Sequence, residues 1–441
     1  MLDLRLLLAQ LIVILIAAWL AGALVRPLGQ PRVIGEILAG IALGPSLLGA
    51  VAPHVSTLLF PPARLLPLAT LSQLGVLLFM FVVGLRIDLT VLRKRVYSAI
   101  AVSHASIAVP FVLGASLAPW LYTSLAGRGI NGTGVALLPF ALFLGAAMSV
   151  TAFPVLSRIL AERGLQGSTL GSVALASAAI GDVTAWCVLA AVVAVTRAEN
   201  GIASFALTLG GAITFAVLLT VVGRRLLVAL DQRRLARTVN VSADVVGAAI
   251  VFALVCAFIT ERLGVHALFG SFIAGAVMPR SSELARGLAD RMEAIVSTVF
   301  LPVFFVYTGL QTEIGLLSTL AMWGICAVVI TAAIAGKFGG STVAARLSGM
   351  SWRDAMGIGV LMNTRGLMEL VVLNVGLELG VLSKPLFAIM IVMALVTTMM
   401  TSPLLAFVLR GTPTLDRPSA NANLQSTVHQ ANAKSAAAPG Q

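Results

Sequence analysis

Long apolar runs recur along almost the whole chain, and most of them are long enough to cross a lipid bilayer. A spanning helix needs about 20 consecutive, mainly apolar residues, and 59% of the 441 residues are hydrophobic while only 10% are charged. This composition excludes a soluble globular domain and predicts an all-α integral membrane protein. The apolar runs predict about 13 transmembrane helices, at residues 5–25, 32–49, 66–85, 96–121, 134–160, 168–195, 203–228, 243–262, 265–279, 292–311, 317–346, 354–380 and 385–409.

The basic residues indicate how these helices are oriented. Of the 29 Lys and Arg residues, 21 fall in the odd-numbered connections and after the last helix, and six fall at the N-terminus and in the even-numbered connections. The positive-inside rule then places the N-terminus outside and the C-terminus in the cytoplasm, and we expect a bacterial inner membrane. This placement accounts for the net charge of +12, so we expect no nucleic-acid partner.

Residues 1–410 and 411–441 differ in character. The first range carries the apolar runs and predicts one transmembrane domain. The second is rich in Ala, Asn, Ser, Gln and Pro and has almost no large apolar side chains, which predicts a disordered cytoplasmic tail.

A short sequence pattern occurs twice. Phe79–Leu89 and Phe304–Ile314 align Gly84 with Gly309, and an Ala-Gly pair ending at Gly40 matches another ending at Gly275. Seven helices separate the members of each pair, so the two copies are expected to cross the membrane in opposite directions. Inverted repeats of this kind are typical of secondary transporters.

Two charged residues interrupt spanning segments. Asp182 lies near the middle of the apolar run at 174–195, where a charge costs about 2.5–3.5 kcal/mol even on the more lenient insertion scale. Such a residue usually marks an ion or proton pathway, although a polar residue tied to a neighbouring helix is the alternative. Lys337 lies equally deep in the helix at 317–346, and Asp182 is its expected partner.

Two predicted helices carry helix-breaking sequences. Pro154 lies inside the helix at 134–160, and a polar stretch ending in glycine interrupts the helix at 354–380: Asn363, Thr364, Arg365 and Gly366. Non-helical backbone at membrane depth is tolerated only where protein or a water-filled cavity surrounds it. A simple proline kink is the alternative at Pro154. Arg365 needs a buried partner, and Glu369 is one candidate because it follows four residues later.

Four segments carry a resemblance to the monovalent cation:proton antiporter superfamily, and most of all to its branch of plant and fungal cation/proton exchangers. The resemblance extends over about residues 5–410. Its most specific parts are Q-P-R-V-I-G-E-I-L-A-G-I-A-L-G-P-S-L-L-G (30–49), T-A-F-P-V-L (151–156), G-V-H-A-L-F-G-S-F-I-A-G (264–275) and L-M-N-T-R-G-L-M-E-L-V-V-L-N (361–374).

The resemblance implies a fold and a set of site residues. It implies a homodimer in which scaffold helices at about 5–85 and 243–311 hold a core at about 96–195 and 317–409 that moves as an elevator. The two broken helices would cross inside that core. Asp182 and Thr151 match the residues that bind the cation and proton, and Lys337 matches a supporting lysine. Gly181 departs from the pattern, because family members carry an acidic residue or asparagine there.

These features predict a secondary antiporter that exchanges K⁺ or Na⁺ for H⁺ by competition at Asp182. A single carboxylate favours electroneutral exchange. We expect no cofactor, no enzymatic activity and no metal other than the transported cation. The main alternative is a sodium-coupled symporter of an organic or anionic solute. A channel or sensory protein is a weaker alternative, and an intramembrane aspartyl protease would need a second deep aspartate that the sequence lacks.

Overall fold

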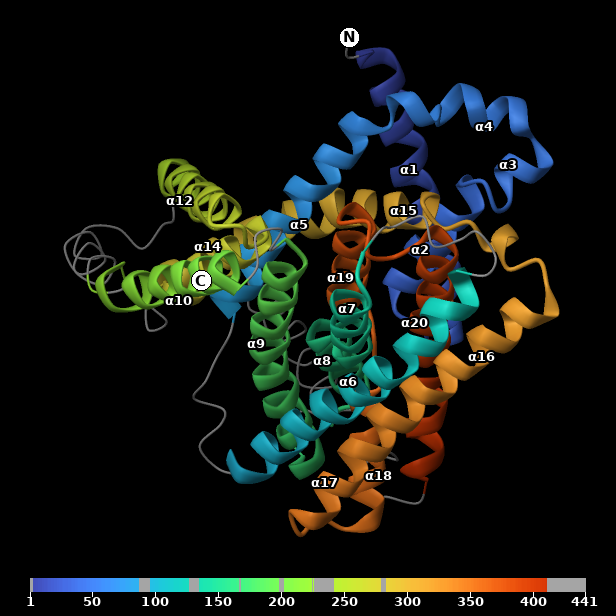
Figure 1. Cartoon of the computed structure of the whole chain (residues 1–441). Helices are drawn as coiled ribbons and strands as arrows, with labels where there is room; N and C mark the ends of the chain where they lie inside the picture. The colour runs from blue at the N-terminus through green and yellow to red at the C-terminus, as the bar shows by residue number, and fades with distance from the viewer. Residues whose placement is uncertain are drawn as a thin grey trace, which may run out of the picture.

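The structure is a computed structural model, and it describes residues 3–86, 96–126, 135–165, 168–197, 202–223, 225, 242–278 and 283–410. Within these ranges it is helical and contains no strand (Figure 1). Nine of the described helices are long and apolar enough to span a membrane, or ten if one bent pair is counted as a single span, and three shorter apolar helices accompany them. The all-helical membrane fold is therefore confirmed, whereas the count of 13 crossings stays a prediction.

The helices pack in two groups. One group consists of α1 (Leu4–Val25), α2 (Arg32–Leu43), α5 (Leu66–Arg86), α12 (Ala243–Arg262), α13 (Ala267–Val277), α14 (Glu283–Ile295) and α15 (Leu301–Leu310). The other consists of α6 (Val96–Ala126), α7 (Leu137–Ser149), α8 (Phe153–Glu162), α9 (Thr169–Arg197), α16 (Leu320–Ile334), α17 (Gly340–Leu347), α18 (Trp352–Met362), α19 (Leu367–Glu378) and α20 (Lys384–Val408). α10 (Ile202–Leu218) belongs to neither group and contacts α9.

The repeated glycines lie where helices from the two copies of the repeat touch. Gly40 on α2 faces Gly309 on α15, and a Cβ atom built on Gly40 would lie 2.2 Å from the carbonyl oxygen of Val306. Gly84 on α5 faces Gly275 on α13 in the same way. These two contacts are equivalent under the repeat, because each joins a helix of one copy to a helix of the other. Only glycine permits so close an approach of two backbones.

Substitution of these glycines should destabilise the fold. We expect Gly40→Ala or Gly275→Ala to cost about 1–3 kcal/mol or more, because the added methyl group meets a carbonyl oxygen that cannot rotate away. Gly324→Ala is the matched control, since nothing lies within 4 Å of a Cβ atom at that helical position. Thermal unfolding in detergent measures the difference. Equal melting temperatures for Gly40→Ala and Gly324→Ala would contradict the packing described here.

Several helix boundaries differ from the predicted ones, including that of α6, which ends at Ala126 rather than at residue 121. Two further differences have a clear basis in the sequence. The helix predicted at 292–311 begins at Glu283, because α14 is amphipathic and carries charged residues that interrupt an apolar run. The helix predicted at 32–49 ends at Leu43, where Gly44 and Pro45 follow, and the connection then forms the short helices α3 (Leu48–Val51) and α4 (Pro53–Leu59). The predicted tail, 411–441, lies outside the described residues.

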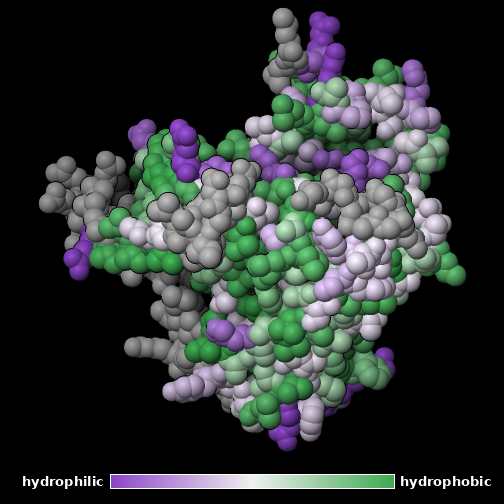
Figure 2. Space-filling view, viewed as in Figure 1, coloured by the Kyte–Doolittle hydropathy of each residue, from purple (hydrophilic) through white to green (hydrophobic). Residues whose placement is uncertain are grey.

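Apolar side chains cover much of the surface seen in Figure 2. On α1, large side chains such as Ile12, Ile16, Trp19 and Leu24 are more than half exposed. A surface of this kind is stable when lipid tails surround it, which agrees with an integral membrane protein.

Candidate functional site

The two broken helices meet at their interruptions. α7 ends at Ser149 and α8 begins at Phe153, while α18 ends at Met362 and α19 begins at Leu367. The backbone N–H of Ala152 in the first break donates a 3.0 Å hydrogen bond to the carbonyl oxygen of Thr364 in the second. α18 and α19 are bent by 42° at their break.

Pro154 lies in the first turn of α8, where a missing N–H costs nothing. The three residues from Val150 to Ala152 are not helical. Pro154 therefore starts a separate half-helix, and the alternative of a simple kink within one continuous helix is wrong.

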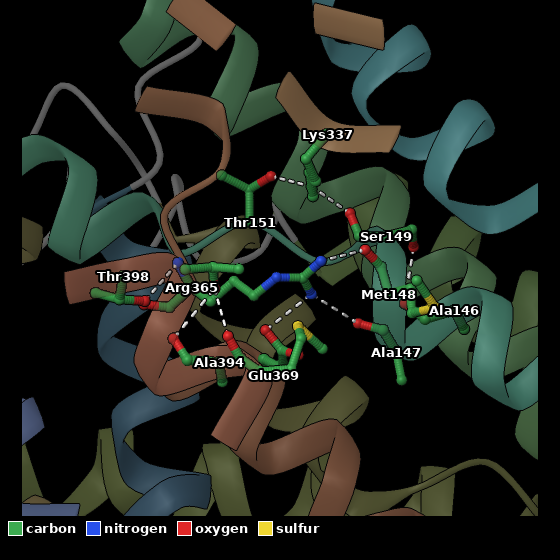
Figure 3. A network of polar contacts seen from close by, with 12 residues as sticks. Ala146, Ala147, Met148, Ser149, Thr151, Lys337, Arg365, Glu369, Ala394 and Thr398 are labelled. Carbon is green, nitrogen blue, oxygen red and sulfur yellow. Dashed lines mark hydrogen bonds and ion pairs between the residues drawn. The ribbon is translucent and has the colours of Figure 1, made fainter. Parts of the chain in front are cut away.

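Arg365 connects the second break to the end of α7 (Figure 3). Its guanidinium forms a 2.9 Å ion pair with Glu369, and both side chains are fully buried. It also donates to the carbonyl oxygens of Ala147 at 3.4 Å and Met148 at 2.9 Å. These carbonyls belong to the last turn of α7 and have no partner within the helix. The expected pairing of Arg365 with Glu369 is thus confirmed.

Lys337 binds the same end of α7. It lies in a π-helical turn at Ala335–Gly339 between α16 and α17 and is fully buried. Its ammonium group donates to the carbonyl oxygen of Ser149 at 2.5 Å and to the hydroxyl of Thr151. Among the described ion pairs none joins Lys337 to Asp182, so the expected direct pair is wrong. The unpaired carbonyl at the negative end of a half-helix is the partner instead.

Thr398 on α20 supports the second break. Its hydroxyl accepts a 3.0 Å hydrogen bond from the Arg365 N–H and donates a 2.8 Å bond to the Arg365 carbonyl. Asn363 and Thr364 are buried in the same break. Sequence reasoning missed Thr398, because a threonine in an apolar helix gives no sign of which backbone it binds.

Asp182 lies on α9, which packs against α7, α8 and α18. Its side chain is 3% exposed, and within the described residues its Oδ1 atom has no hydrogen-bond partner. Lys337 acts on it through its charge at a distance longer than that of an ion pair. The structure therefore brings a buried, incompletely satisfied carboxylate to the helices that form the crossing. Among the described residues, no hydrogen bond or ion pair ties Asp182 to a neighbouring helix, as the alternative interpretation would require.

Two cavities lie between the two groups of helices, at opposite ends of α19. One has a volume of about 550 Å³ and reaches Val155 and Leu367 at the starts of α8 and α19. The other, of about 390 Å³, extends along α19 from Val371 to Glu378. Asp182 is not among the residues that line either cavity.

Crossed broken helices, paired buried charges and a repeat with equivalent helix contacts define a secondary transporter. Comparison with known proteins agrees with this class. A family model described as "Sodium/hydrogen exchanger, transmembrane" matches residues 11–411. The chain belongs to the sodium/hydrogen exchanger family.

Named relatives refine the comparison. The Na(+)/H(+) antiporter NhaS4 of Synechocystis is 44% identical over 402 residues, which are 91% of this chain and 97% of that protein. The Cation/H(+) antiporter 17 of Arabidopsis thaliana is 39% identical and the K(+)/H(+) antiporter 1 of Saccharomyces cerevisiae is 34% identical. The chain spans about half the length of the plant relative, 48%, and 43% of the yeast one.

A solved structure shares the fold. The sodium proton antiporter MjNhaP1 of Methanocaldococcus jannaschii superposes with a TM-score of 0.61, covering 93% of this chain and 97% of that chain at 15% sequence identity. At this identity the likeness shows the fold alone.

Proposed function

We propose that this protein exchanges a monovalent cation, K⁺ or Na⁺, for H⁺, and that the two ligands compete for Asp182. The observation that carries the proposal is a carboxylate next to two broken helices that is 3% exposed and has one oxygen without a partner among the described residues. A bare buried carboxylate is costly, whereas a bound proton or cation neutralises it. The relatives reported above are named Na(+)/H(+), Cation/H(+) or K(+)/H(+) antiporters, which supports antiport and gives the symporter alternative no support.

The charges at the crossing favour electroneutral exchange. Lys337 binds a carbonyl and a hydroxyl, and Arg365 and Glu369 neutralise each other. Within the part of the chain that the structure describes, Asp182 at the crossing forms no ion pair. Either ligand adds one positive charge at the same place. One cation then moves for each proton, and the membrane potential does no net work on the cycle.

The second group of helices is proposed to move as a core against the first group as a scaffold. Contacts inside the core are buried, such as those of Arg365 and Lys337. Several contacts between the groups are hydrogen bonds of single polar side chains, including Gln73 to Glu378 at 2.8 Å and Gln30 to the Met399 carbonyl at 3.1 Å. Such contacts can break and re-form without disturbing the crossing. Thr151, which binds Lys337, would line the site together with Asp182.

The remaining parts of the proposal concern the setting of the protein. The charge asymmetry of the connections supports a bacterial inner membrane with the N-terminus outside. The expected homodimer would form through the scaffold helices, and the lipid bilayer is the surrounding medium.

Proteoliposomes test the function directly. We expect K⁺ or Na⁺ to drive proton movement that a pH-sensitive dye reports, at a rate that clamping the potential leaves unchanged. The apparent KM for the cation should rise as the pH falls, because protons compete for the same oxygens. Solute accumulation without proton movement would overturn antiport, and a rate that follows the clamped potential would overturn only electroneutrality.

A further inference from the structure

Gly181 precedes Asp182 on α9, and a single neighbouring atom lies near the place that a side chain would occupy. A Cβ atom built on Gly181 would meet one atom within 4 Å, the hydroxyl oxygen of Ser103 on α6, at 3.4 Å. That distance is an ordinary van der Waals contact. Close packing of backbones therefore does not require glycine at this position. Gly336, in the π-helical turn between α16 and α17, shows the contrast, because its Cβ atom would lie 2.9 Å from the Pro110 Cα atom on α6.

Ser103 is fully buried, and its hydroxyl has no hydrogen-bond partner among the described residues. The hydroxyl of Ser106, one turn further along α6, behaves differently and donates a 2.8 Å bond to the Ser103 carbonyl. Buried polar groups are nearly always hydrogen-bonded, and an exception calls for an explanation. Among the described residues, the unpartnered oxygen of Ser103 lies against Gly181, the residue before Asp182, whose own Oδ1 atom also has no hydrogen-bond partner.

We propose that Ser103 is a ligand of the transported cation, and that its hydroxyl supplies from α6 the oxygen that residue 181 does not supply from α9. This inference rests on the proposed function. A dehydrated alkali cation needs several oxygen ligands, and a carboxylate alone provides two. Ser103 lies against Gly181, so its hydroxyl reaches α9 one residue before Asp182.

The proposal is tested by measuring cation binding and cation/proton exchange in the Ser103→Ala variant. We expect the apparent Kd for K⁺ or Na⁺, measured as the cation-dependent rise in melting temperature at high pH, to increase about tenfold, as the loss of one ligand would produce. The apparent KM for exchange should increase similarly, with little change in the maximum rate. Ser106→Ala is the matched control, because it removes a buried serine hydroxyl from the same helix that is already bonded to backbone, and we expect wild-type values from it.

A second variant separates ligation from a structural role. A Cβ atom at residue 181 makes an ordinary contact with the Ser103 hydroxyl, and Ser103→Ala removes that hydroxyl. Ser103→Ala/Gly181→Ser therefore returns a hydroxyl to the contact between α6 and α9 from the opposite helix. We expect it to recover most of the lost affinity. Unchanged affinity in Ser103→Ala, or equal loss in Ser106→Ala, would overturn the inference while wild-type exchange persists. Absence of exchange in the wild-type protein would instead overturn the proposed function.

Discussion

Asp182→Asn is expected to abolish cation-driven proton flux in proteoliposomes, down to the level of liposomes without protein. Asparagine has the size of aspartate, but it cannot bind a proton within the working pH range and carries no charge to hold a cation. The buried site then has nothing to exchange. The variant should fold, because the Oδ1 atom that changes has no partner to lose among the described residues.

Its control is Asp290→Asn, which removes an exposed carboxylate from a 2.9 Å pair with Arg86. Glu293 also pairs with Arg86, so the loss should be small. We expect exchange at the wild-type rate from this variant. Size-exclusion profiles establish that both variants are folded, and exchange that persists in folded Asp182→Asn would remove Asp182 from the mechanism.

The second large effect concerns stability. Arg365→Met should lower the free energy of unfolding by about 3–5 kcal/mol, because Glu369 is left as an uncompensated buried charge. The carbonyl oxygens of Ala147 and Met148 lose their donor as well. Unfolding in mixed detergent micelles measures the change. Removing both charges in Arg365→Met/Glu369→Leu should restore part of the loss.

An exposed ion pair provides the comparison. Lys384 and Glu313 are 2.6 Å apart, with side chains 62% and 30% exposed, and Lys384→Met should cost no more than about 1 kcal/mol. The interpretation of the buried pair fails if Arg365→Met costs as little as Lys384→Met. It also fails if the double variant is less stable than Arg365→Met alone.

Much of the crossing could be predicted from the sequence because its signals are local. Pro154 and the polar stretch around Asn363 mark the breaks by residue type. The spacing of Arg365 and Glu369 predicts a pair between the second break and the first turn of α19. Asp182 and Lys337 are conspicuous because ionised side chains are rare within apolar runs. The helices themselves follow from the apolar runs, apart from amphipathic α14.

The partners of the buried cations could not be predicted in the same way. Lys337 and Arg365 bind backbone carbonyls at the end of α7, and every residue carries such a carbonyl. Met148 and Ser149 differ from other residues because they lie in the last turn of α7, where no later N–H group of the helix donates to their carbonyl oxygens. The proximity of Ser103 to Gly181 likewise depends on how α6 packs against α9. The sequence of neither helix indicates that packing.

The glycine contacts also have a consequence for biogenesis. Gly40 packs against Gly309, and Gly84 packs against Gly275. The helices that carry Gly40 and Gly84 therefore leave the ribosome long before the helices they pack against have been synthesised. Neither half can complete its own packing, and the nascent N-terminal segments must remain in the bilayer as loosely associated helices until the later ones are inserted. Truncated chains that end before α13 should therefore be substrates for membrane proteases rather than stable half-proteins.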